Sequence, residues 1–515
     1  MDFISKPKAR RVIPNWRYYN NTLQLGELDS LSSDINNINF YPIDEYINDW
    51  IDKKSVHRAT DLISSAICNS QKENPFVLEA ARYLLYENSQ NITNIHRRMS
   101  NFILNKDGDS DTRIKQLHLR AMDKLDSVTD VAKRIHAFRI IAHANPYNPI
   151  VYVDMARAYT TIGELEKAEQ LIKLSLHLDP RSRFVARAAA RFYIHIGDFD
   201  KAAYVILKTG YSKYDPWLMA SAISVGMLQG KRSSYIKKGE QMAFSDKLTP
   251  FCISELASTL GTIEMEDGYR KTSRNLFSRS LISPNDNSLA QVRWASRSYN
   301  LQIDINDSIN ISNGYEEMSY RLLADGKYEE AMDSVIDWIC DMPFSEKSVR
   351  LGYDISTILL RDYNLSSKVL EVGLKANPNN KDMLNNRAYI NALSNNIEEA
   401  QSDMKKLEKI CDIYEGGTIP ICMIATQGLI LYRTGNAEEG RKKYHHAIQM
   451  AKDLNDEGVV IKAQLNMYRE DIIDSDFTDL DTIKAVEELN IPDKFIDLKY
   501  LQDEIIRLIE KRNDI

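Results

Sequence analysis

The stretch PIVYVDMARAYTTIGELEKAEQLIKLSLHLDP, residues 149–180, is followed at once by a second copy, RSRFVARAAARFYIHIGDFDKAAYVILKTG, which begins at Arg181. Three pairs of identical residues recur at a spacing of 34: Tyr159 and Tyr193, Gly163 and Gly197, Ala168 and Ala202. A fixed period of this length is the sequence signature of a stacked repeat. The sequence therefore predicts an all-α fold, an α-solenoid of stacked antiparallel helical hairpins.

Each part of the 34-residue unit has a physical task. Tyr152, Met155 and Tyr159 recur at helical spacing and form the apolar stripe of a first helix. Gly163 stands where this helix must end, because glycine adopts the left-handed conformation of a helix C-cap at little cost. Ala168 is small, so a second helix can approach the first one closely at the turn.

The glycine, the small residue five positions later, the tyrosine and the closing proline of this unit resemble the tetratricopeptide repeat. The resemblance implies a superhelix whose first helices line a concave groove that binds other proteins. One known groove of the family clamps acidic peptide C-termini with lysines and asparagines. Val153 stands where such a lysine would lie, so that particular ligand is not supported.

Working outward from the two copies divides the chain into five parts. These are an N-terminal arm at 1–54, basic and then polar, a first helical array at 55–300, an irregular joint at 301–312, a second array at 313–452 and an acidic helical cap at 453–515.

The two ends of the chain each leave two alternatives. The arm either packs Trp16 and Tyr18 onto the first hairpin or serves as a basic tail that reaches a partner or nucleic acid. The acidic end, with its amphipathic helix FIDLKYLQDEIIRLIEKR, either shields the last hairpin, as repeat arrays require, or docks a partner.

Composition points to a cytoplasmic protein. The net charge of −7 argues against general coating of nucleic acid, and the five scattered cysteines fit a reducing compartment. The start MDFISKPKARR lacks the apolar stretch of a secretory signal, and no apolar run is long enough to span a bilayer. We therefore expect no membrane insertion.

Motifs of catalysis and metal binding are missing from the sequence. It has no phosphate-binding glycine loop, no nucleophile elbow and no zinc-protease helix, so we expect no enzymatic activity and no cofactor. Asp107, Asp109 and Asp111 suggest a calcium loop, but Thr112 and His118 occupy the positions that need glycine and a carboxylate. A solvated loop between helices is the better interpretation.

The candidate binding residues are four arginines. Arg183, Arg187 and Arg191 are four residues apart and line one side of a helix, and Arg191 aligns with Arg157 of the preceding copy. In the tetratricopeptide repeat these positions face the groove. They either form a patch for carboxylates or phosphates, which arginine forks fit, or lie on a solvated face that neighbouring carboxylates balance.

Two functions remain open at this point. The first is a non-catalytic scaffold or adaptor that binds a protein partner, an extended peptide or helix with an acidic segment, in its groove. The alternative is a nucleic-acid-binding or nucleic-acid-responsive regulatory subunit that uses the arginine face. Repeat coverage favours the first, since aromatic residues suited to stacking on single strands are sparse near the arginines.

Overall fold

A computed structural model describes residues 10–18, 43–68, 74–86, 121–122, 124–245, 247–305, 311, 313–414, 416–474, 480–492 and 494–513, together with residues 96, 100, 103 and 104. Within these ranges the chain is helical and contains no strand. Contacts divide it into two compact units, one of residues 19–120 and one of residues 1–18 and 121–515. The all-α prediction is confirmed.

The described residues of the smaller unit include the helices α1 (Ile43–Asp52), α2 (Val56–Cys68) and α3 (Pro75–Tyr86). Its core is a single apolar cluster in which Trp50, Leu62, Ile63 and Leu84 are fully buried.

The first half of the larger unit runs in chain order through α6 (Ala132–Ala144), α7 (Pro149–Thr161), α8 (Leu165–Leu178), α9 (Arg183–His195), α10 (Phe199–Lys208), α11 (Pro216–Leu228), α12 (Ile236–Ala243), α13 (Pro250–Glu266), α14 (Arg270–Ser280) and α15 (Asp286–Tyr299). The second half contains α16 (Tyr315–Ala324), α17 (Tyr328–Asp341), α18 (Glu346–Asp354), α19 (Tyr363–Ala376), α20 (Lys381–Leu393), α21 (Ile397–Ile410), α22 (Ile419–Arg433), α23 (Ala437–Asp453), α24 (Glu457–Ile473), α25 (Leu480–Glu487) and α26 (Ile496–Asn513). A π-helical turn, Ile355–Leu359, continues α18.

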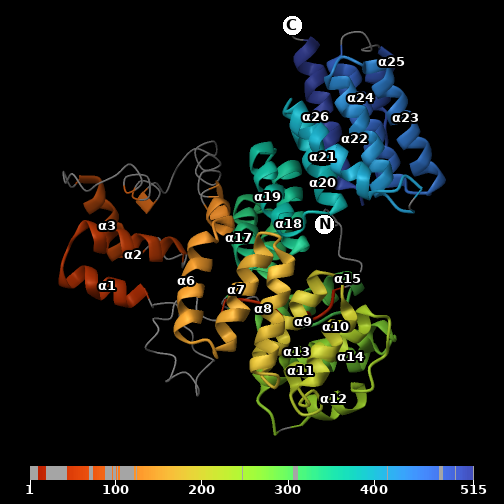
Figure 1. Cartoon of the computed structure of the whole chain (residues 1–515). Helices are drawn as coiled ribbons and strands as arrows, with labels where there is room; N and C mark the ends of the chain where they lie inside the picture. The colour runs from red at the N-terminus through yellow and green to blue at the C-terminus, as the bar shows by residue number, and fades with distance from the viewer. Residues whose placement is uncertain are drawn as a thin grey trace. The chain divides into compact units, whose positions relative to one another are not determined.

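Hairpins of the predicted kind fill the larger unit (Figure 1). The helices pair as α7 with α8, α9 with α10, α13 with α14, α16 with α17, α20 with α21 and α22 with α23. Gly163, Gly197, Gly326 and Gly435 all have φ between 74° and 79°, the left-handed region that favours glycine. Asn395 takes the same place in the α20–α21 hairpin with φ 60°. The predicted turns are confirmed.

Small residues lie where the two helices of each hairpin cross. Ala168, Ala202, Ala331 and Ala400, each five positions after its turn residue, are completely buried. Gly163 has a second reason to be glycine, because a Cβ atom there would collide with the backbone carbonyl of Lys375. Helix α7 also contacts α19 directly, so two hairpins that are far apart in the sequence lie against each other.

The first helices of successive hairpins are neighbours. Helix α7 packs on α9, α9 on α11, α11 on α13 and α13 on α15, and α20 packs on α22 and α22 on α24. These helices form an inner surface on which two cavities lie. We call this inner surface the groove.

Between α15 and α16, the described residues 301–305 form no helix, and Leu301 is buried against the end of α15. Near the C-terminus, α26 buries Leu498, Ile505 and Ile509 in a cluster with Ile461 and Leu465 of α24. This is the packing that a capping role requires. The division into five parts stays a prediction, and the contacts place residues 10–18 with the larger unit.

No helix in the described ranges is both long and apolar enough to cross a bilayer. The aspartates of the loop at 105–113 lie outside the described residues.

Substitution of Ala202 by leucine tests the close helix crossing. Ala202 is completely buried, whereas Ala137 on α6 is exposed. Ala202→Leu should destabilise the protein by about 1–3 kcal/mol because the added methylenes have no space. Ala137→Leu should have little effect. Urea denaturation followed by circular dichroism measures both, and equal losses for the two variants would contradict the assigned register of the repeats.

Candidate functional site

Residues 10–18, which we call the N-terminal segment, lie extended in the groove. The segment contains no helix, and its side chains alternate between buried and half-buried along its whole length. Arg10, Val12, Pro14, Trp16 and Tyr18 are the buried members. Alternation with a period of two is the geometry of an extended chain with one side turned into a surface. The segment is the red trace beside α7, α9 and α15 in Figure 1.

Two aromatic residues anchor the segment. Trp16 is 1% exposed and packs against Phe192 of α9 and Phe344, with ring centroids 6.3 and 5.5 Å away. Tyr18 packs against Phe138 of α6. The expectation that both rings pack onto the first hairpin is therefore wrong in its location, because their partners belong to the larger unit. Sequence pattern shows that an aromatic residue must be buried, but not which distant surface receives it.

Backbone carbonyls of the segment are held by side chains of the groove. Asn287 and Gln291 of α15 donate amide hydrogens to the carbonyls of Ile13 and Arg10, at 2.8 and 2.9 Å. Arg157 of α7 donates from Nε to the carbonyl of Trp16 at 2.8 Å. Every third residue from Arg10 to Trp16 is thus held through its main-chain carbonyl, in addition to any contact that its side chain makes.

Ion pairs at both ends fix the direction of the segment. Arg10 is 3% exposed and donates to both carboxylate oxygens of Glu316, at 2.8 and 2.7 Å. Burial alone would raise the pKa of Glu316, but the charge and the hydrogen bonds of Arg10 outweigh it and lower that pKa to about 2. At the other end, Arg17 binds Asp286 and Asp341.

The four predicted arginines lie on the groove, but most are engaged within the chain. Arg157 is 4% exposed and donates to the backbone of Trp16 and Asp341. Arg187 binds the buried carboxylate of Glu255 at 2.8 Å, and Arg183 binds Asp215. Of the two pairs, only that of the exposed Arg183 with Asp215 resembles a solvated, carboxylate-balanced face, since Glu255 is buried. Arg191 differs, since the guanidinium lies 4.9 Å from the ring centre of Phe344 and makes no ion pair among the described residues.

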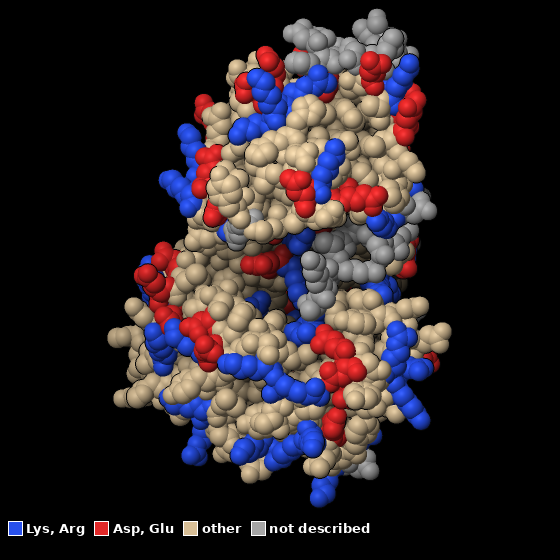
Figure 2. Space-filling model, turned by 90° about the vertical axis from the view of Figure 1, so that its right-hand side faces the viewer, with Lys and Arg blue, Asp and Glu red and all other residues tan. Residues whose placement is uncertain are grey.

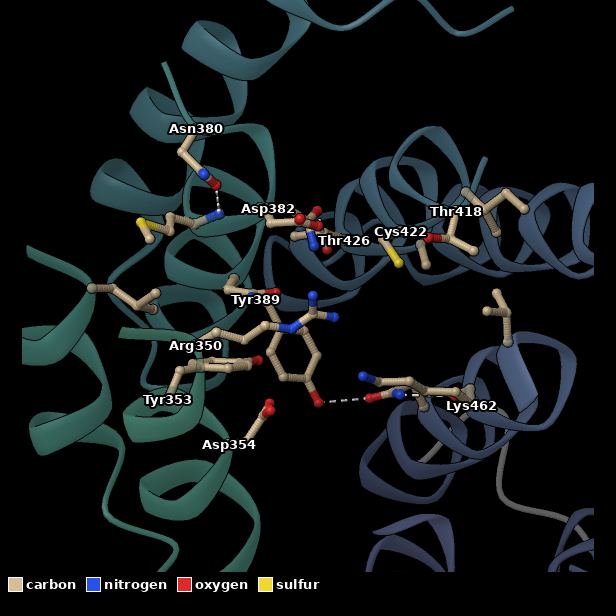
Figure 3. A pocket seen from close by; sticks show the side chains of 18 of the residues that line it. Arg350, Tyr353, Asp354, Asn380, Asp382, Tyr389, Thr418, Cys422, Thr426 and Lys462 are labelled. Atoms are coloured by element: carbon tan, nitrogen blue, oxygen red, sulfur yellow. Dashed lines mark hydrogen bonds between the residues drawn. The ribbon is translucent and has the colours of Figure 1, made fainter. Parts of the chain in front are cut away.

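A larger cavity, of about 400 Å³, opens farther along the groove between α18, α20, α22 and α24 (Figure 3). Arg350 of α18 and Lys462 of α24 extend into it from opposite sides. We call it the C-terminal cavity. Its polar lining also includes Asp354, Asp382, Asn385, Asn386, Tyr389, Cys422, Thr426 and Asn466.

The C-terminal cavity contains charges of both signs that form no ion pair with one another within the described residues. Burial raises the pKa of the half-buried Asp354 to about 6, against the opposing charges of Arg350 and Lys462. Tyr389 donates its hydroxyl to Asn466 at 2.8 Å, which fixes the ring in the cavity wall. Such a lining offers donors, acceptors and charges to a ligand but no nucleophile paired with a base.

Sequence reasoning missed the C-terminal cavity, although a signal for it exists. Arg157 and Arg191 each lie six residues before the turn glycine of their hairpin, and Tyr389 lies six residues before Asn395. Arg187 and Asn385 both lie ten residues before their turns. The same two positions of the repeat therefore face the groove in both halves.

The described residues bring together no group of three or more histidine, cysteine, aspartate and glutamate side chains that could hold a metal ion.

Fold and groove together define an α-solenoid of tetratricopeptide-like helical hairpins. No protein-family model matches the sequence, and no curated protein matches it either. Among solved structures, the yeast Tom70 crystal structure is 12% identical over 77% of this chain and 97% of that chain, with a TM-score of 0.27. The TPR domain of P58(IPK) is 13% identical over 78% of this chain and 99% of that chain, with a TM-score of 0.19. Because these identities and TM-scores are so low, the assignment to this class of fold rests on the helical hairpins of the chain itself.

Replacing Trp16 tests whether the N-terminal segment is anchored as described. Trp16→Ala should weaken docking of the segment by about 3–5 kcal/mol, because it leaves a large hole beside Phe192 and Phe344. Amide hydrogens of residues 10–18 should then exchange at least about 100-fold faster. Ile13→Ala, at a half-buried position, should accelerate exchange much less. Unchanged protection in Trp16→Ala would disprove the anchoring role.

Asp354 gives a prediction with a defined pH dependence. Its folded pKa of about 6 lies above the ordinary 3.8, so the folded state disfavours the carboxylate and loses stability as the pH rises through this window. Asp354→Asn should raise the melting temperature at about pH 7.5 by about 1–2 °C, with the gain shrinking as the pH approaches 4. The control is Asp382→Asn, at an exposed position of the same cavity, which should give no gain. A pH-independent effect of Asp354→Asn would contradict the burial argument.

Proposed function

We propose that this protein is a non-catalytic scaffold that holds an extended segment of a partner protein in the C-terminal cavity of its groove. One observation carries the proposal: the groove already holds an extended peptide, the chain's own residues 10–18, by aromatic anchors and side-chain contacts to main-chain carbonyls. A surface that binds one extended chain in this way has the chemistry to bind another.

The C-terminal cavity is suited to the same mode of recognition. It continues the groove beyond the N-terminal segment, and Glu346 and Lys347 line both this cavity and the one beside the segment. Asn385 and Asn386 supply amide groups like those of Asn287 and Gln291, which bind the segment. Tyr389 supplies an aromatic wall. A volume of about 400 Å³ has room for a few side chains of a peptide.

An acidic residue in the partner remains part of the proposal, but at a different place from the arginine face. Arg157, Arg183 and Arg187 are engaged with groups of the chain, so an acidic ligand there would have to displace them. Arg350 and Lys462 extend into the C-terminal cavity and make no ion pair among the described residues. An acidic side chain of the bound segment would form an ion pair with one of them.

The nucleic-acid alternative finds no specific support in the arrangement of charge. On the face shown in Figure 2, lysine and arginine side chains alternate with aspartate and glutamate and form no continuous basic band. A nucleic-acid surface needs clustered positive charge to release counterions. The cytoplasmic location proposed with the scaffold function rests on the scattered cysteines of the sequence.

Site-specific photo-crosslinking in cells that produce the protein tests the proposal. A photoreactive amino acid at Asn386, in the wall of the C-terminal cavity, should link to one recurrent peptide sequence that mass spectrometry identifies. The same amino acid at Lys405, exposed on α21, is the matched control and should not link to that peptide. Tyr389→Ala should abolish the link from position 386. Identical products from both positions, or no product from the cavity, would reject the function.

A further inference from the structure

A second, smaller cavity of about 250 Å³ lies between the N-terminal segment and the larger unit. Its walls include Arg191 of α9, Lys347 of α18 and residues Arg10, Arg11 and Asn15 of the segment. We call it the segment-side cavity. It is separate from the peptide-binding cavity proposed above, although Glu346 and Lys347 line both.

Two of its cations are unbalanced. Neither Arg191 nor Lys347 forms an ion pair or a side-chain hydrogen bond with the described residues, and Arg191 only stacks on Phe344. Burial lowers the pKa of Arg191 to about 10, and the one charge that opposes this shift is that of the exposed Glu346. Burial likewise lowers the pKa of Lys347 to about 8; Arg10 and Arg191 add to the effect, and Glu316 opposes it.

Most other charged groups of this cavity are already matched, and the exposed Glu346 forms no ion pair with Arg191 or Lys347 among the described residues. Arg10 binds Glu316, and Arg11 binds Glu266. Burial and the charge of Arg191 lower the pKa of His195 to about 4, so its imidazole is neutral at physiological pH. Arg191 and Lys347 therefore remain as two positive charges in the lining of one cavity, and neither forms an ion pair with a carboxylate among the described residues.

Two half-buried cations that line one cavity without an ion pair repel each other, and a bound anion relieves this repulsion. The guanidinium offers a planar fork of donors and the ammonium adds a compact charge, a combination that fits a tetrahedral oxyanion. We propose that the segment-side cavity binds a phosphate-type oxyanion between Arg191 and Lys347, either free inorganic phosphate or the phosphate group of a small molecule.

Binding there has a structural consequence for the N-terminal segment. One wall of the cavity is the segment itself, through Arg10, Arg11, Ile13 and Asn15, and the other is formed by α9 and α18. An anion held by Arg191 and Lys347 shares the cavity with Arg10 and Arg11 of the segment, whose positive charges are in place only when the segment is docked. It therefore stabilises the docked segment by linkage.

The experiment titrates the full-length protein with inorganic phosphate and, separately, with a nucleoside monophosphate, at constant ionic strength set by sodium chloride. Calorimetry measures the affinity, and the melting temperature and the hydrogen exchange of residues 10–18 are recorded in parallel. Phosphate should raise the melting temperature and slow exchange of the segment. Tighter binding of the nucleoside monophosphate would show that the phosphate is carried on a larger molecule; equal or weaker binding would identify the free ion.

Variants decide whether the two cations form the site. The double variant Arg191→Gln with Lys347→Gln should weaken phosphate binding at least about tenfold. If the double variant unfolds, Lys347→Gln alone tests the site and should also weaken binding. Arg183→Gln, on the same helix but exposed and bound to Asp215, is the matched control and should bind as the wild type does. Absence of binding by either ligand, or equal binding by all variants, would overturn the proposal. The photo-crosslink from position 386 is independent of this outcome.

Discussion

The close crossing of two helices at a tight turn is the constraint on which the rest of this structure depends. A left-handed residue reverses the chain, and five residues later a side chain no larger than alanine lets the second helix lie against the first. Each hairpin then buries one face on its neighbour, so the array grows through local contacts alone. Where the turn residue is asparagine, at Asn395, the same geometry survives at a modest conformational cost.

Stacking in this way places the first helices side by side and leaves their inward positions to define the groove. In the first half of the larger unit these positions hold arginine, asparagine and glutamine, and the N-terminal segment satisfies them. In the second half they hold Tyr389 and Asn385, and no described segment covers them. One repeat geometry therefore produces an occupied stretch and an open stretch of the same surface.

The shape of the groove determines which of its charged side chains need a partner. Side chains that point inward lose water on several sides, so an ionised group there needs a partner. Arg10 and Glu316 provide one for each other, and the pKa of Glu316 falls accordingly. Asp354 has no such partner, and its pKa rises. Unbalanced groups of this kind mark the places where a ligand would lower the free energy most.

The sequence by itself determined the repeat. The 34-residue spacing of Gly163 and Gly197, and of Ala168 and Ala202, predicted the hairpins and their turns, because helix periodicity and glycine conformation are local properties. The resemblance to the tetratricopeptide repeat further implied that Arg157 and Arg191 face the groove.

Only the tertiary structure decided what those residues contact. Trp16 meets Phe344, and Arg10 meets Glu316, across more than three hundred residues, and no periodic pattern specifies such pairings. The same holds for the C-terminal cavity, where Arg350 and Lys462 come together only because α18 and α24 curve around one space. Local sequence fixes each helix and its inward face, whereas long-range packing selects the partners of that face.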